Sequence, residues 1–205
     1  MRLGVFGGTF DPVHYGHLLL AECCREQAGL DAVWFLPAAV PPHKQDQKLS
    51  TAEHRIAMLK LAIAGNERFS LCTYETDRGG INFTVDTLRH ILAEEAGRDL
   101  FLLIGQDMLE DLPNWRDPET VCELALPLVV HRSGKGALDL GCLSEIASPG
   151  RIEEIRRHQV EMPEIGLSAS AIRQRVAAGK SIRYQTPRAV EKYIEAQGIY
   201  RSTTS

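Results

Sequence analysis

Short apolar runs alternate with longer amphipathic segments along most of the chain. The apolar runs predict strands at 2–6, 32–36, 69–73, 100–104 and 125–130, with a weaker strand at 159–162. Segments with helical periodicity lie between them, near 17–28, 51–64, 84–96 and 117–123. Strands joined by helix-length crossovers predict an α/β fold, with a doubly wound parallel sheet and helices on both of its faces.

Capping residues predict where several helices begin and end. Ser50 followed by Glu53 is typical of a capping box at the start of the second predicted helix. Asp117 and Thr186 each precede a proline, which predicts a capping side chain followed by proline at the first helical position. Gly198 predicts the end of the last helix.

Composition is that of an ordinary globular protein. The 205 residues are 44% hydrophobic and 24% charged, without an internal repeat, and predict a single domain over 1–205 with a small helical C-terminal part from about 166. A net charge of −4 argues against a general nucleic-acid binder. No apolar run reaches the roughly 18 residues of a membrane span, and the N-terminus enters a strand without a secretory signal. We therefore expect a cytoplasmic protein whose five cysteines are reduced thiols.

Two connections are long, at 38–50 and 132–150. Loops of such length are uncommon unless they are functional or mobile. Ligands of an open parallel sheet bind at the carboxyl ends of the strands, where the strand order reverses. The loops after the first, second and fourth strands all lie at that edge, so we expect one pocket to collect them.

The segment 7–17 carries the strongest chemical signal. It reads Gly-Gly-Thr-Phe-Asp-Pro-Val-His-Tyr-Gly-His, with a glycine pair after the first apolar run and with His14 and His17 where the helical pattern begins. Backbone N–H groups and the positive end of a helix favour a phosphate there, and histidines three apart can reach one anion. Taken separately, the glycines are also typical of a plain turn, and the histidines of a surface pair or two metal ligands.

As one string, the segment resembles the G-G-x-F-D-P-x-H-x-G-H motif of the nucleotidyltransferase superfamily, in which the H-x-G-H histidines bind the phosphates of ATP. The resemblance implies a Rossmann-like fold of the nucleotidyltransferase type and catalytic roles for His14 and His17. It assigns ATP binding to Gly7, Gly8, Thr9 and Phe10.

A second segment, 167–173, reads Leu-Ser-Ala-Ser-Ala-Ile-Arg. Alone, it predicts a helix N-cap at Ser168 and a surface arginine. It also resembles the superfamily's I-S-S-T-x-x-R motif, which embraces the triphosphate. The resemblance implies ATP contacts from Ser168 and Ser170 and a catalytic role for Arg173, whereas Ala169 departs from the motif and loses a hydroxyl.

Further segments resemble one branch of the superfamily, the bacterial nicotinate-nucleotide adenylyltransferases. Pro-Pro-His-Lys at 41–44 is a stiff loop with a solvated lysine when taken alone; the resemblance implies that Lys44 contacts a substrate phosphate. Asn-Phe-Thr-Val-Asp-Thr-Leu at 82–88 places Thr84 at a helix start. The resemblance implies that Thr84 faces the nicotinate carboxylate, with a plain N-cap as the alternative.

Three more positions match that branch. Gly105 and Asp107 resemble its G-x-D, with Asp107 accepting hydrogen bonds from ribose hydroxyls or merely capping a helix. Trp115 lies in a loop, and the resemblance implies that it stacks on the pyridine ring, with core packing as the alternative. Arg132 resembles the arginine of R-P-G, with Ser133 in place of proline. Its implied role is a ligand-phosphate contact, against exposure without a role.

The resemblance implies that ATP and nicotinate mononucleotide are converted to nicotinate adenine dinucleotide (deamido-NAD) and pyrophosphate in NAD biosynthesis. The attacking phosphate oxygen is ionised at neutral pH, so the reaction needs alignment and cationic groups rather than a general base. Mg²⁺ is expected to travel with ATP, since no carboxylate cluster forms a protein-bound metal site. We expect no nucleic-acid or membrane partner, and a homo-oligomer stays open.

The sequence leaves several alternatives open. A related adenylyltransferase could use amidated nicotinamide mononucleotide, which differs from the acid at one heteroatom, or pantetheine phosphate, whose enzymes carry T-x-G-H where this chain has His14. A nucleotide-binding regulator could keep the fold without turnover. A zinc-binding module would need a third ligand beside the two histidines.

Overall fold

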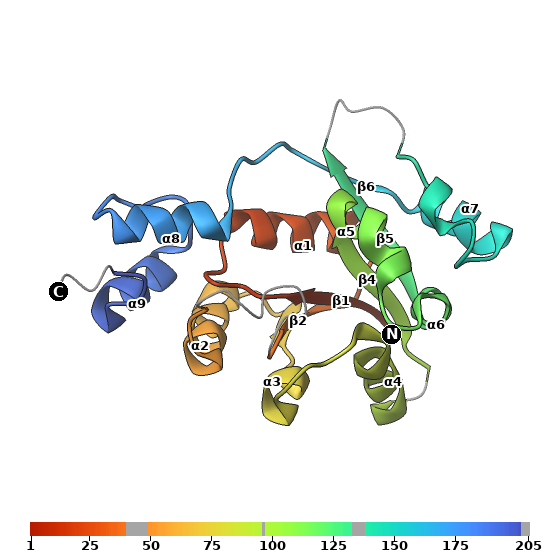
Figure 1. Cartoon of the computed structure of the whole chain (residues 1–205), viewed down its shortest axis with the longest axis horizontal. Helices are drawn as coiled ribbons and strands as arrows, with labels where there is room; N and C mark the ends of the chain where they lie inside the picture. Colours follow the sequence, from red (N-terminus) through yellow and green to blue (C-terminus); the bar gives the residue numbers. More distant parts are fainter. Residues whose placement is uncertain (40–48, 96, 133–137, 202–205) are drawn as a thin grey trace.

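The structure of the chain is a computed structural model that describes residues 1–39, 49–95, 97–132 and 138–201. Its strands form one sheet in the order β3-β2-β1-β4-β5-β6, and all neighbouring strands are parallel (Figure 1). The strands are β1 (Arg2–Gly8), β2 (Ala32–Pro37), β3 (Phe69–Leu71), β4 (Asp99–Gly105), β5 (Ala125–Arg132) and β6 (Val160–Met162). The predicted α/β fold with a doubly wound parallel sheet is confirmed.

The middle of the sheet reads as continuous apolar sequence because both of its faces are covered. In β4, all side chains from Leu100 to Ile104 are buried. The strand order reverses between β1 and β4, which are paired in register from Arg2 with Asp99 to Val5 with Leu102. The carboxyl ends of these two strands therefore flank the crevice in which sheets of this kind bind ligands.

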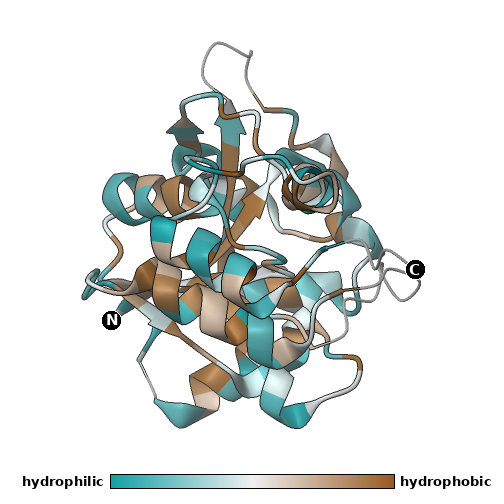
Figure 2. Cartoon of the chain, turned by 90° about the vertical axis from the view of Figure 1, so that its left-hand side faces the viewer, coloured by the Kyte–Doolittle hydropathy of each residue, from teal (hydrophilic) through white to brown (hydrophobic). Residues whose placement is uncertain are grey.

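Helices cover both faces of the sheet. Figure 1 shows α1 and α8 on one side of the sheet and α2, α3 and α4 on the other. Figure 2 shows hydrophobic and hydrophilic positions mixed along these helices, as expected for elements with one face on the core. The helices are α1 (Tyr15–Gln27), α2 (Ala52–Ile63), α3 (Tyr74–Arg78), α4 (Thr84–Glu94), α5 (Gln106–Asp111), α6 (Pro118–Leu124), α7 (Pro149–Arg157), α8 (Ala169–Ala177) and α9 (Arg188–Gln197). Short 3₁₀ turns lie at η2 (Leu112–Asn114) and η3 (Gly141–Leu143).

Two of the predicted caps are wrong because tertiary contacts occupy the side chains. Thr51, rather than Ser50, precedes α2, and the Ser50 hydroxyl and backbone N–H both donate to the Asp11 carboxylate. Pro187 precedes α9, and the Thr186 hydroxyl donates to the Val13 carbonyl at 2.7 Å. Both side chains bond the loop after β1 instead of a helix end.

The other two boundaries agree with the sequence. Pro118 opens α6 behind Asp117, which adopts a left-handed conformation with φ of 53° and binds Arg89 at 2.9 Å. Gly198 ends α9 with φ of 63°, in the left-handed conformation that glycine adopts without steric cost.

The part of the long connection 132–150 that the structure describes, from 138 on, is less irregular than predicted. It contains η3 and the start of α7, whose N-cap Ser148 accepts a hydrogen bond from the Arg151 N–H at 3.2 Å. Most of 38–50 lies outside the described residues. The five cysteines are free thiols. Throughout the part of the chain that the structure describes, no helix combines the length and apolar character needed to cross a membrane.

Candidate active site

His14 and His17 meet at the start of α1, after the short loop that follows the glycine pair at the end of β1. His14 is the N-cap residue, with extended backbone, and its N–H donates to Nδ1 of His17 at 3.3 Å. The two imidazole rings are stacked, with centroids 3.7 Å apart and planes 19° apart. The histidines are thus adjacent at a helix N-terminus as predicted, although they stack across the cap rather than share a helix face.

Gly16 and Phe10 explain why this segment needs its particular residues. A Cβ atom at Gly16 would lie 3.0 Å from Nδ1 of His14, so a larger residue would displace that ring. Phe10 has φ of 49°, a strained conformation for a bulky residue, and its buried ring stands edge-on to His17 at 5.1 Å between centroids. Core packing of Phe10 therefore supports the second histidine.

Burial controls the charge of His14. The residue is 6% exposed, and burial lowers its pKa from 6.5 to about 4. Its Nδ1 is buried and has no hydrogen-bond partner among the described residues. At neutral pH the ring is therefore a neutral imidazole, which carries one N–H that can donate to an anion.

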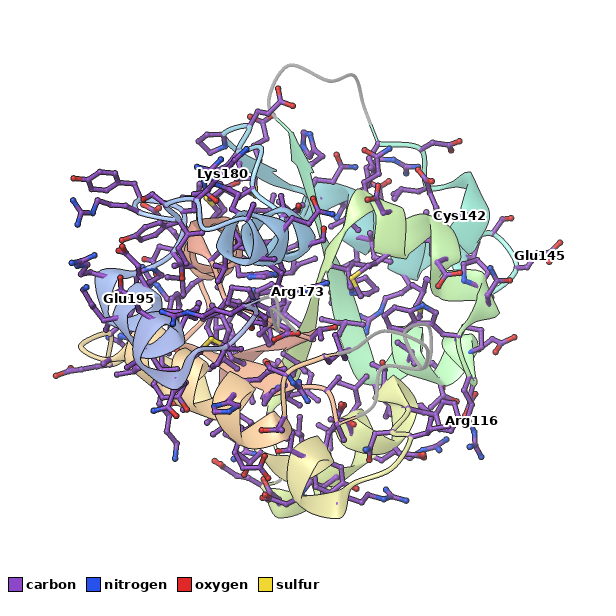
Figure 3. The ribbon with its side chains drawn as sticks, turned by 60° about the vertical axis from the view of Figure 1, so that its left-hand side comes forward. Arg116, Cys142, Glu145, Arg173, Lys180 and Glu195 are labelled. Carbon is purple, nitrogen blue, oxygen red and sulfur yellow. The ribbon has the colours of Figure 1, made fainter. Side chains whose placement is uncertain are left out.

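Arg173 joins the second motif to the first. Its guanidinium donates to the backbone carbonyl of Asp11 at 2.7 Å, across 162 positions of sequence. In Figure 3, the label of Arg173 lies near the centre of the molecule, whereas those of Lys180 and Glu195 lie nearer its edge. Because Asp11 lies between the glycine pair and the histidines, this bond places a cation beside the loop after β1.

Two serines form the start of the arginine-bearing helix. Ser168 is the N-cap of α8, where its hydroxyl accepts the Ala171 N–H at 3.2 Å. The Ser170 hydroxyl lies 3.3 Å from that of Ser168. The N-cap prediction is confirmed, and both hydroxyls lie at the positive end of the helix, where an anion is favoured.

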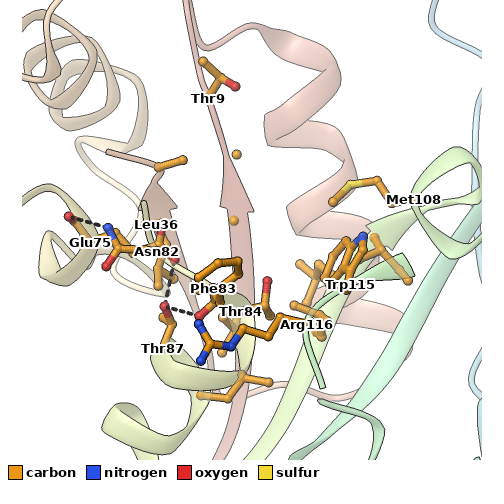
Figure 4. A pocket seen from close by; sticks show the side chains of 18 of the residues that line it. Thr9, Leu36, Glu75, Asn82, Phe83, Thr84, Thr87, Met108, Trp115 and Arg116 are labelled. Carbon is orange, nitrogen blue, oxygen red and sulfur yellow. Dashed lines mark hydrogen bonds between the residues drawn. The ribbon is translucent and has the colours of Figure 1, made fainter. Parts of the chain in front are cut away.

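A cavity of about 470 Å³ extends from the loop after β1 to α4 and the segment after α5 (Figure 4). Gly7 and Gly8 at the end of β1, together with Thr9, contribute to one part of its wall, so the cavity lies at the carboxyl edge of the sheet. Other lining residues are Leu36, Ala38, Glu75, Asn82, Phe83, Thr84, Thr87, Met108, Asn114, Trp115 and Arg116. As described, the lining includes neither histidine nor Arg173.

Thr84 and Trp115, which the resemblance assigns to the nicotinate, line the same cavity. Thr84 is the first residue of α4, behind Phe83 as N-cap, so backbone N–H groups of the helix start lie beside it. Trp115 follows η2 and is half-buried, with its indole N–H donating to Asp111 at 3.2 Å. The indole of Trp115 thus both packs on the core and lines the cavity.

The cavity also contains residues that the sequence did not single out. The Arg116 guanidinium lies over the Phe83 ring, 4.5 Å from its centroid, an arrangement typical of a cation–π contact. The Glu75 carboxyl accepts the Thr87 hydroxyl at 2.8 Å, and burial raises the pKa of Glu75. The position of Arg116 directly after Trp115 was the one sequence signal that could have placed it in the cavity. No such signal pointed to Glu75.

The remaining predicted residues have mixed outcomes. Gly105 ends β4, and Asp107 lies exposed in the first turn of α5 without lining the cavity. Lys44 lies outside the described residues, and Arg132 ends β5 with its side chain outside them. Their roles stay predictions.

Comparison with known proteins defines the class to which this fold and site belong. Residues 5–175 match the cytidylyltransferase-like family model. The chain belongs to this family of nucleotidyltransferases.

The chain is 44% identical over 201 residues to a probable nicotinate-nucleotide adenylyltransferase of Thermomicrobium roseum, covering 98% of this chain and 92% of that protein. It is 40% identical over 204 residues to another from Geobacillus thermodenitrificans, covering 100% and 88%. Within the family, it therefore belongs with the nicotinate-nucleotide adenylyltransferases.

Solved structures agree on the fold. The Plasmodium falciparum nicotinic acid mononucleotide adenylyltransferase complexed with NaAD superposes with a TM-score of 0.76 at 16% identity, over 97% of each chain. A structure of the same enzyme complexed with APC gives a TM-score of 0.75 at 16% identity, over 97% of this chain and 96% of that one.

Proposed function

We propose that this chain transfers the adenylyl group of ATP to nicotinate mononucleotide, with deamido-NAD and pyrophosphate as products, in NAD biosynthesis. The observation that carries the proposal is the carboxyl end of β1: Gly7 and Gly8 line the cavity of Thr84 and Trp115, and the loop that follows leads directly into the stacked histidines. A triphosphate on this loop and a flat acid in the cavity would be neighbours. The names of the relatives support the same reaction.

The transfer is a displacement at phosphorus. An ionised oxygen of the mononucleotide phosphate attacks the α-phosphorus of ATP, and the bond from that phosphorus to the bridging oxygen breaks. The electron pair leaves with pyrophosphate. His14, His17 and Arg173 would stabilise the developing negative charge, His14 as a neutral N–H donor and Arg173 as a cation.

Binding of the two substrates would use the rest of the site. The ATP side comprises Gly7, Gly8, Thr9, Phe10, Gly105, Asp107, Ser168 and Ser170. In the cavity, the open start of α4 at Thr84 would accept the nicotinate carboxylate and Trp115 would stack on the pyridine ring. Lys44 and Arg132 would contact phosphate groups.

Mg²⁺ would arrive on the phosphate oxygens of ATP and neutralise part of their charge. Within the described ranges, no three His, Cys, Asp or Glu side chains gather as a metal site. A cytoplasmic location and the absence of a nucleic-acid partner are part of the same proposal.

Turnover of three acceptors, measured side by side, tests the proposal. Purified protein is mixed with ATP, Mg²⁺ and either nicotinate mononucleotide, nicotinamide mononucleotide or pantetheine phosphate, and pyrophosphate release is followed. We expect the acid mononucleotide to have the highest kcat/KM and deamido-NAD to form in equal amount with pyrophosphate. Preference for another acceptor would contradict the proposed substrate. No pyrophosphate release with any of the three acceptors would favour a regulator without turnover.

A further inference from the structure

Asp11 is the convergence point of three segments that are far apart in the sequence. Its side chain is fully buried. The carboxylate accepts the Ser50 backbone N–H at 3.1 Å, together with the hydroxyls of Ser50 and Tyr200. The phosphate-binding motif is thus bonded to the residue before α2's N-cap and to a residue beyond α9.

A buried arginine completes this cluster. Arg55 on α2 is 2% exposed and attracts the Asp11 carboxylate electrostatically. Its guanidinium donates to the carbonyls of Thr9 at 3.0 Å, Ala39 at 3.2 Å and Ser50 at 3.3 Å. Arg55 therefore bonds the main chain of the loop after β1, at Thr9, to the main chain at Ala39 and Ser50.

The backbone at Tyr200 is arranged to deliver its hydroxyl. Gly198 turns the chain at the end of α9, and Tyr200 itself has φ of 66°, a left-handed conformation that costs energy in a residue with a bulky side chain. Burial and the facing Asp11 carboxylate raise the pKa of Tyr200, so the phenol keeps its proton and stays a donor. The conformational cost is offset by this buried, charge-assisted hydrogen bond.

Asp11 transmits this contact to the phosphate site. Its backbone carbonyl accepts the Arg173 guanidinium at 2.7 Å, while its side chain is fixed by Tyr200 and Ser50. A shift of Asp11 would move both the carbonyl that orients Arg173 and the loop that leads to His14.

We propose that Tyr200 is a positioning residue of the ATP site: its hydroxyl, bonded to the Asp11 carboxylate, fixes the loop after β1 and the Arg173 guanidinium that the loop orients. The inference rests on the proposed function, since it assigns the ATP phosphates to this loop. It concerns ATP more than the mononucleotide, because neither Asp11 nor Arg173 lines the cavity of Thr84 and Trp115.

Tyr193 provides a matched control. It lies on α9, and its hydroxyl bonds Nδ1 of His54 on α2 at 2.9 Å. Tyr193→Phe therefore removes one hydrogen bond that docks α9 on its neighbours, here on α2, without touching Asp11. If Tyr200 merely docks α9, the two substitutions should have the same effect.

The experiment compares wild type, Tyr200→Phe and Tyr193→Phe by calorimetric ATP titration, by kcat and KM for each substrate, and by Tm. We expect Tyr200→Phe to lower ATP affinity and kcat/KM for ATP about tenfold, the loss of one hydrogen bond to a buried charge. Its KM for nicotinate mononucleotide should stay within about twofold of wild type. Tyr193→Phe should leave the kinetic constants within about twofold while also lowering Tm.

The inference would be overturned if Tyr200→Phe and wild type had the same ATP affinity and the same kcat/KM for ATP at a temperature well below Tm. It would also be overturned if Tyr200→Phe and Tyr193→Phe lost ATP affinity equally. If Tyr200→Phe does not fold, Ser50→Ala removes the other hydroxyl donor to the same carboxylate oxygen. It should lower ATP affinity in the same direction, and unchanged affinity contradicts the inference. A wild type that binds ATP without turnover would refute the proposed function, yet the affinities would still test Tyr200.

Discussion

Gly8 and Phe10 approach so closely that a Cβ atom at Gly8 would lie 2.9 Å from the Phe10 ring. That ring is buried against Phe6, at 5.3 Å between centroids, and against His17. Gly7 is different, because a Cβ atom there would meet no atom within 4 Å. The two positions therefore need glycine for different reasons. Gly8 makes room for the packed Phe10 ring, and Gly7 leaves open space beside the cavity.

Gly8→Ala should destabilise the protein by about 1–3 kcal/mol, since the new methyl group must displace a packed aromatic ring. Gly7→Ala should change the free energy of unfolding by less than about 0.5 kcal/mol, because open space receives its methyl group. Urea denaturation of both variants measures the difference. Equal stability of the two variants would contradict the packing role of Gly8.

The buried His14 should make stability depend on pH. Its pKa of about 4 in the folded state lies below the ordinary value of 6.5, so between these two values the unfolded chain binds a proton that the native chain excludes. Stability therefore falls as pH decreases from 6.5 to 4, by about 3 kcal/mol from this group, and is unaffected by it above 6.5.

His14→Gln should remove this part of the pH dependence. The measurement is the free energy of unfolding of wild type and variant at pH 7 and pH 4.5, where the difference between the two proteins isolates His14 from the carboxylates. A difference that does not change with pH would show that the native imidazole is protonated normally.

His17→Ala should lower kcat about 100-fold or more while the protein stays folded, because one donor to the departing pyrophosphate is lost. His90→Ala is the control, since His90 stacks on Tyr74 and does not line the cavity. Steady-state kinetics and circular dichroism of both variants test the role. Near-normal turnover of His17→Ala would reject it.

Arg116→Gln should reduce the preference for the acid mononucleotide over the amide. The Arg116 guanidinium lines the cavity, and a positive charge there favours a carboxylate by Coulomb attraction. We expect the ratio of kcat/KM values to fall about three- to tenfold, a modest effect because Arg116 is exposed and solvent screens its charge. Arg89→Gln, which removes a partner of Asp117 outside the cavity lining, should leave the ratio unchanged.

Strand periodicity predicted the fold because the sheet is covered on both faces and its strands read as apolar runs. The positions of His14, His17, Ser168 and Thr84 at helix starts were also predictable because the signals for a helix start are local, whereas their roles in the site came from the resemblance to known motifs. Ser50 and Thr186 were assigned to caps because a hydroxyl before a helix has the same local pattern whether it caps that helix or bonds a distant loop.

Long-range partners had no such local signal. Tyr200 and Arg55 meet Asp11 through the packing of α9 on α2, which periodicity does not encode. Glu75 lines the cavity from a helix of five residues, too short for a periodic pattern. The stacking of His14 on His17 likewise depends on the extended backbone at the N-cap, which spacing alone does not reveal.

The central claim is that the stacked histidines at the start of α1 bind the phosphates of ATP. NMR spectra of the protein labelled with ¹⁵N-histidine, recorded with and without a non-hydrolysable ATP analogue, test it directly. The account predicts that the analogue shifts the His14 and His17 ring signals and raises the pKa of His14 from about 4, because an anion favours the protonated ring. Unchanged signals from both rings at saturating nucleotide would contradict it.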